Sequence, residues 1–178
     1  MTVPAANVLI VIPRNQFAED ELFPLKEKLE AAGCRVWVLS RTGKEALGMN
    51  KTKFQPDGML ADWNKQEGVP GKYDAVIVTG GKGAPKTLWT DDLLPQMLTD
   101  HVRAGKIVAG TGLGIGSLAQ ANVLIGEASA GDHPELLQVL DNAAIADSGE
   151  PFTQTENVMT ATGPDAASQL ADAILSAF

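Results

Sequence analysis

The residues best suited to chemistry surround a strand-to-helix turn between Ile107 and Ala119. A short apolar run stops at closely spaced glycines and resumes as a helix, which is typical of a sharp turn at the carboxyl edge of a sheet. Many enzymes place a nucleophile on such a turn, in the pattern Gly-x-nucleophile-x-Gly. Gly110 and Gly114 frame this pattern, and the nucleophile position is Gly112. Because glycine has no side chain, the turn has the form of an active site without a reactive atom.

Three other positions could supply polar groups to the same site. Glu21 is in the first turn of the first predicted helix, and its alternative is a solvated acid favoured by the helix dipole, as we predict for Glu19 and Asp20. Gly80-Gly81 could present backbone N–H groups as an oxyanion hole requires, or could form only a tight turn. His133 could act as an acid or base, or could be an ordinary surface histidine.

The remaining candidates have simpler interpretations. His101, four residues before Gly105, is interpreted as a residue at a helix C-terminus whose charge complements the dipole. Cys34 is interpreted as a packed thiol, and as the only cysteine it excludes an internal disulfide and a multi-cysteine metal site. No pair of histidines has ligand spacing, and Ser117 interrupts a dinucleotide fingerprint that starts at Gly112. We therefore predict neither a metal nor a cofactor.

Length and charge limit the function classes. The 178 residues fit one domain, residues 1–178, and the net charge of -8 argues against nucleic acid or an anionic membrane as a partner. The apolar run Val8–Ile12 is too short to span a bilayer and lacks the features of a signal peptide, so we interpret it as a first strand. These observations favour a cytoplasmic protein.

Strands and helices alternate along the chain, which predicts an α/β fold with a mostly parallel sheet and helices on both faces. The predicted strands are 7–12, 35–40, 74–78, 107–110, 127–130 and 158–161, with a small β excursion over 46–54. The predicted helices are 19–32, from Thr90 to about Ala104, the segment after the glycine turn, 133–140, and a last helix that starts at Gly163-Pro164, with a short helix or turn near Trp63. Ligands of such sheets bind outside the carboxyl ends of the strands, so the turns at 19–21, 80–81 and 110–114 should converge.

Taken in order, these segments resemble the ThiJ/PfpI superfamily, also called the DJ-one class. The resemblance rests on segments spread over nearly the whole chain: 17–22, 29–33, 73–78 with Gly80-Gly81, 105–109 before the glycine turn, 118–126 and 158–164. It implies a flavodoxin-like three-layer sandwich, similar to class I glutamine amidotransferases, and a homodimer or higher homo-oligomer. Members of this superfamily include deglycase- or glyoxalase-like enzymes, peptidases, isonitrile hydratases and stress-related chaperones.

The resemblance also implies roles for particular residues. The family's helix acid corresponds to Glu21, its backbone donors to Gly81 and Leu113 beside Gly80, and its turn cysteine to Gly112. The family's histidine falls on Leu113 in one arrangement; in another it resembles His133 with an offset of one residue. Covalent catalysis needs a thiolate, so the implied site has lost its nucleophile.

Three hypotheses follow. The first is a family member without the catalytic cysteine that acts by binding a small polar molecule or by assembly, with no cysteine-dependent activity. The second is a thiol-independent hydratase, hydrolase or glyoxalase-like enzyme with Glu21 and His133 as acid and base. The third is a purely structural oligomer or a chaperone-like surface.

Overall fold

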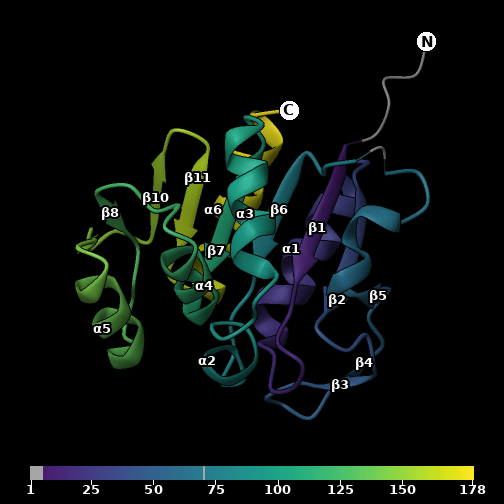
Figure 1. Ribbon diagram of the computed structural model, residues 1–178, viewed down its shortest axis with the longest axis horizontal. Coiled ribbons are helices and arrows are strands. Elements are labelled where there is room, and N and C mark those ends of the chain that lie inside the picture. The colour runs from purple at the N-terminus through teal and green to yellow at the C-terminus, as the bar shows by residue number, and fades with distance from the viewer. Residues whose placement is uncertain (1–5, 70) are drawn as a thin grey trace.

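The computed structural model describes residues 6–69 and 71–178 and is built on a seven-stranded sheet. The strand order is β10-β11-β7-β6-β1-β2-β5 (Figure 1). Neighbouring strands are parallel, except that β10 runs antiparallel to β11. The prediction of an α/β fold with a mostly parallel sheet is confirmed.

The sheet consists of β1 (Asn7–Val11), β2 (Arg35–Ser40), β5 (Gly58–Met59), β6 (Ala75–Val78), β7 (Ile107–Thr111), β10 (Phe152–Thr155) and β11 (Val158–Ala161). Two small pairs lie beside it: β3 (Ala46–Leu47) with β4 (Lys53–Phe54), and β8 (Glu127–Ala128) with β9 (Ala146–Asp147). The helices are α1 (Glu19–Ala31), α2 (Ala84–Thr87), α3 (Leu94–Arg103), α4 (Ile115–Gln120), α5 (Pro134–Asn142) and α6 (Ala167–Ser176). Short 3₁₀ segments are η1 (Leu60–Lys65), η2 (Gly112–Gly114) and η3 (Pro164–Ala166).

Helices cover both faces of the sheet, giving three layers (Figure 1). Alternate side chains of a strand point to opposite faces. Accordingly, Leu9 and Val11 of β1 pack in a core with α3, α4 and α5, whereas Val8 and Ile10 pack with α1 and α6. All five residues of β1 are buried, as expected for a strand covered on both sides.

The carboxyl ends of β1, β6 and β7 lie at one edge of the sheet because these strands are parallel and adjacent. Helix α2, the segment η2 and the β3–β4 hairpin lie at this edge, and the chain's C-terminus lies at the opposite edge (Figure 1). The fold therefore gathers the loops that follow the central strands.

One helix boundary differs from its prediction. The sequence predicts a helix from Thr90, but α3 begins at Leu94. Oδ1 of Asp91 accepts hydrogen bonds from the N–H groups of Leu93 and Leu94 at 2.9 and 3.0 Å. Asp91 thus binds backbone N–H groups at the start of the helix, and Thr90, Asp91 and Asp92 are not part of its first turn.

Helix α2 and strands β5 and β10 were not predicted. The residues of β10 are half-buried or exposed, because it is an edge strand with one neighbour. Such a strand does not appear in the sequence as a continuous apolar run. The predicted strand over 127–130 is shorter in the structure, where β8 covers only Glu127–Ala128.

Among the described residues, every helix is too short or too polar to cross a bilayer.

Candidate functional site

The turns that follow β1, β6 and β7 meet at the carboxyl edge, as the sequence predicted. The N–H of Ala18 donates to the carbonyl of Gly80 at 3.0 Å. The N–H of Gly80 donates to Oε1 of Glu21 at 2.9 Å, and the hydroxyl of Thr111 donates to the same oxygen. One buried carboxyl group therefore joins the first helix to the ends of two central strands.

Glu21 is the centre of this cluster, with 5% of its surface exposed. Burial raises its pKa, and this effect exceeds the opposing hydrogen bonds from Thr111 and Gly80 and a favourable charge interaction with His133. Oε1 accepts both hydrogen bonds, whereas Oε2 has no hydrogen-bond partner among the described residues. The raised pKa favours the protonated form of Glu21, and in that form Oε2 can donate a hydrogen bond.

Gly112 faces this free oxygen. A β-carbon built on Gly112 would lie 2.9 Å from Oε2 of Glu21 and 3.2 Å from Oε1. The φ angle of Gly112 is +51°, in the left-handed region, where a residue other than glycine costs about 1–3 kcal/mol. Any side chain at this position would contact the carboxyl group, and glycine leaves that contact unmade.

The two glycines after β6 have different roles. The N–H of Gly80 is occupied by Glu21 and does not face an open crevice. The N–H of Gly81 has no hydrogen-bond partner among residues 6–69 and 71–178. Gly81 has a φ of +122°, and a β-carbon on it would lie 2.2 Å from the carbonyl oxygen of Gln16 and 2.6 Å from the nitrogen of Ala18. Only glycine allows this close approach of the two loops.

Leu113 is held by a tryptophan that the sequence analysis did not identify. Nε1 of Trp89 donates to the carbonyl of Leu113 at 2.7 Å. The indole ring covers Gly116, where a β-carbon would lie 2.1 Å from Cε2. Trp89 follows the short helix α2, whose four residues gave no periodic signal. Thr111 was also missed, although a polar residue at the end of an apolar strand was a usable signal.

His133 lies immediately before α5 and is half-buried. It makes no hydrogen bond to Glu21 in the structure, but its positive form favours the ionised form of that acid. The structure therefore joins Glu21 to Gly80 and Thr111 by hydrogen bonds and places Gly112 beside the carboxyl group, whereas His133 affects the acid through its charge.

Cys34 lies at the opposite edge of the sheet from Gly112. It directly precedes β2, whereas Gly112 directly follows the parallel strand β7. The thiol is half-buried, and burial, with a smaller effect of Asp74, raises its pKa. The interpretation of Cys34 as a packed thiol agrees with this environment. Within the described part of the chain, no group of three or more His, Cys, Asp or Glu side chains is arranged to hold a metal ion.

Glu19 departs from its prediction as a solvated acid. It is 6% exposed, and its carboxylate accepts hydrogen bonds from the N–H of Asn50 at 2.8 and 3.0 Å and from the N–H of Thr52 at 3.2 Å. Burial acts to raise its pKa, but these backbone hydrogen bonds outweigh burial and the net pKa is lowered. Glu19 anchors the hairpin loop between β3 and β4, whereas Asp20 is exposed as predicted.

His101 is also different from its prediction. It is fully buried, and both ring nitrogens have partners: Nδ1 bonds to the carbonyl of Met97 at 2.7 Å, and Nε2 to the N–H of Tyr73 at 3.2 Å. A carbonyl requires a donor and an N–H requires an acceptor, so the ring is neutral. Burial lowers its pKa further. The predicted role as a charged group at the end of a helix is therefore wrong.

Comparisons with known proteins agree with this architecture. Residues 6–177 match the profile of the DJ-1/PfpI family. The uncharacterized protein MJ0967 of Methanocaldococcus jannaschii is 30% identical over 161 residues, which cover 90% of this chain and 76% of that protein. The crystal structure of a ThiJ/PfpI domain protein from Brachyspira murdochii has a TM-score of 0.86 at 25% identity, covering 98% of this chain and 96% of that one. Drosophila melanogaster DJ-1beta has the same fold, with a TM-score of 0.79 at 22% identity over 96% of this chain and 89% of that one.

Proposed function

Because the chain belongs to the DJ-1/PfpI family, we propose that it is a member in which Gly112 replaces the family's turn cysteine and that it acts by binding a small polar molecule. The observation that carries the proposal is the position of Gly112, which lies beside the buried carboxyl group of Glu21 and has no side chain to reach it. A β-carbon at position 112 would lie 2.9 Å from the free oxygen of the buried acid. A thiol there would face its acid partner, and the chain's only cysteine lies at the other edge of the sheet.

The remaining groups suit binding. The raised pKa of Glu21 favours the form in which Oε2 is a hydrogen-bond donor, and Gly81 offers an N–H without a partner among the described residues. Leu113, which follows Gly112, is the third backbone group that we assign to the ligand. Donors without a nucleophile can hold an oxygen-bearing molecule, but they cannot form the covalent intermediate of cysteine catalysis.

The test compares turnover of a 2-oxoaldehyde by the wild type, Gly112→Cys and Gly112→Ala. We expect no turnover by the wild type or by Gly112→Ala, which has the same backbone strain as the cysteine variant but no thiol. Turnover by Gly112→Cys would show that only the sulfur is missing. Robust turnover by the wild type would overturn the proposal. A folded Gly112→Cys protein without activity would contradict the view that the thiol alone was lost.

One observation favours a second candidate function. A positive charge on His133 would lower the pKa of Glu21, so the two groups are electrostatically coupled and could act as acid and base in a thiol-independent hydration or hydrolysis. In that case Glu21→Gln and His133→Asn should each abolish turnover. Full activity of either variant would remove this candidate.

The proposal includes self-association as a homodimer, the assembly that family resemblance implies. Sedimentation of the wild type at micromolar concentration measures it, and a monomer would contradict this part.

A further inference from the structure

A hollow lies at the carboxyl edge of the sheet, beyond the end of β2. It has a volume of about 240 Å³ and is lined by Arg41, Leu60, Ala61, Asp91, Asp92 and Leu93. These residues come from the end of β2, the start of η1 and the turn that precedes α3. None of them contributes to the cluster around Glu21, so a ligand in this hollow would not touch the site proposed above.

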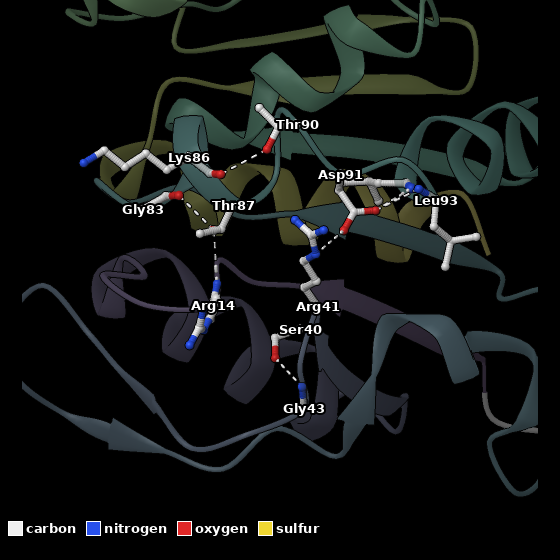
Figure 2. A network of polar contacts seen from close by, with 11 residues as sticks. Arg14, Ser40, Arg41, Gly43, Gly83, Lys86, Thr87, Thr90, Asp91 and Leu93 are labelled. Carbon is white, nitrogen blue, oxygen red and sulfur yellow. Dashed lines mark hydrogen bonds and ion pairs between the residues drawn. The ribbon is translucent and has the colours of Figure 1, made fainter.

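Asp91 is the fixed charge of this hollow, with 7% of its surface exposed. Its Oδ1 accepts hydrogen bonds from the backbone N–H groups of Leu93 and Leu94, and these bonds hold the carboxylate in place (Figure 2). Its Oδ2 lies 3.9 Å from Nε of Arg41. Hydrogen bonds between nitrogen and oxygen are about 2.7–3.2 Å long, so Asp91 and Arg41 form a loose ion pair.

The N–H donors of the Arg41 guanidinium are therefore available to bind another group. Its side chain is 54% exposed, and among the described residues its guanidinium makes no hydrogen bond. Asp92, the next carboxylate, is exposed and has no ion-pair partner within the described part of the chain, whereas Arg41 has only the loose pair with Asp91. One cationic group and one anionic group are thus both available at the rim of a single hollow.

Apolar side chains complete the lining. Leu60 is 1% exposed and belongs to the core, and Leu93 is half-buried beside the ion pair. A ligand with a single charge would pair with only one of Arg41 and Asp92. The other group would remain without a partner or face a like charge, which weakens binding. A ligand with both charges and an aliphatic part would match all three kinds of surface.

We propose that this hollow binds a free α-amino acid with an aliphatic side chain. The planar guanidinium of Arg41 can donate two parallel hydrogen bonds to the ligand's carboxylate. Asp92 and Oδ2 of Asp91 accept hydrogen bonds from its ammonium group. The aliphatic side chain packs on Leu60 and Leu93. Pockets for drug-sized ligands are about 300–1,000 Å³, so a hollow of about 240 Å³ suits a molecule of the size of one amino acid.

The test titrates the full chain with three matched probes and measures affinity by calorimetry. L-Leucine has both charges, 4-methylpentanoate lacks the ammonium group, and 3-methylbutylamine lacks the carboxylate. We expect L-leucine to bind at least about tenfold more tightly than either single-charge probe, because each charged hydrogen bond is worth at least one factor of ten. Equal binding of 4-methylpentanoate would overturn the proposal in favour of a simple anion site, and absence of leucine binding at millimolar concentration would overturn it entirely.

Variants locate the binding. Arg41→Gln and Asp92→Asn change exposed side chains and should fold, and each should weaken leucine binding about tenfold. Lys86→Gln removes the same charge as Arg41→Gln from a nearby exposed position outside the hollow (Figure 2), so it should leave binding unchanged. Unchanged affinity in Arg41→Gln, or equal losses in Lys86→Gln, would contradict the assignment. Glu21→Gln should bind leucine like the wild type, which separates this site from the one at Gly112.

Discussion

Replacing Glu21 with glutamine keeps the shape of the side chain and its hydrogen-bond acceptor but removes its ionisation. Burial raises the pKa of Glu21 above its ordinary value of 4.5 in the folded protein. Between the pKa of the unfolded chain, about 4.5, and the higher pKa of the folded protein, the unfolded chain has released this proton and the folded protein still holds it. The free energy of unfolding therefore falls as pH rises through this range. Each unit by which the pKa is raised costs about 1.4 kcal/mol of unfolding free energy once the pH exceeds the folded pKa. Glu21→Gln should therefore become progressively more stable than the wild type as pH rises from about 4.5.

Glu19, two positions away, provides a matched control of opposite sign. Its folded pKa is lowered by backbone hydrogen bonds, so its contribution is fully present above about 4.5 and is lost as pH falls through the folded pKa. Glu19→Gln replaces one accepting oxygen with a donor opposite the N–H groups of Asn50 and Thr52. We expect it to cost about 1.5–3 kcal/mol at neutral pH, which is the usual contribution of a hydrogen bond to a charged group.

The assay is urea unfolding followed by tryptophan fluorescence from pH 4 to pH 8 for the wild type and both variants. Subtracting the unfolding free energy of each variant from that of the wild type cancels the contributions of the other carboxylates. The Glu21 difference curve should fall as pH rises above about 4.5, whereas the Glu19 difference curve should be level there and fall only as pH decreases below about 4.5. If Glu21→Gln and the wild type remain parallel throughout, Glu21 ionises normally and the assignment of a protonated donor beside Gly112 fails.

Three further predictions test the surroundings of the site. Thr111→Val removes the hydroxyl that bonds to buried Glu21 and should cost about 1–3 kcal/mol in urea unfolding, whereas Thr111→Ser should restore most of it. In thermal unfolding, the stability of the wild type relative to His101→Gln should fall as pH falls below about 6.5, because unfolded His101 takes up a proton that the buried ring resists. Gly116→Ala should displace Trp89, break its bond to Leu113 and shift its fluorescence to longer wavelength; an unchanged spectrum would contradict the packing described.

Local pattern was sufficient for the framework of the molecule. Strands β2 and β11 have their predicted bounds, since each stands out between polar or glycine-rich neighbours. Four residues that recur at helical spacing in the last helix, Ala167, Leu170, Ala171 and Ile174, are all buried. These features depend on the spacing of apolar residues within one element, which the sequence displays directly.

The glycine turn and its convergence with Glu21 could also be predicted. Parallel strands bring their carboxyl ends to one edge of the sheet. Positions 21, 80 and 112 each follow such a strand, so the order of elements alone predicts that they lie together. The sequence could not identify Thr111 as the partner of Glu21, because the contact joins residues far apart in the chain.

The amino-acid sequence by itself therefore determined the α/β architecture, the edge at which the site lies and the absence of a side chain at Gly112. Only the tertiary structure decided which polar residues are buried and in what protonation state. Glu19 and Glu21 occupy the same helical turn, yet hydrogen bonds lower the pKa of one and burial raises that of the other. Burial and hydrogen-bond partners come from loops distant in sequence, and no local pattern contains them.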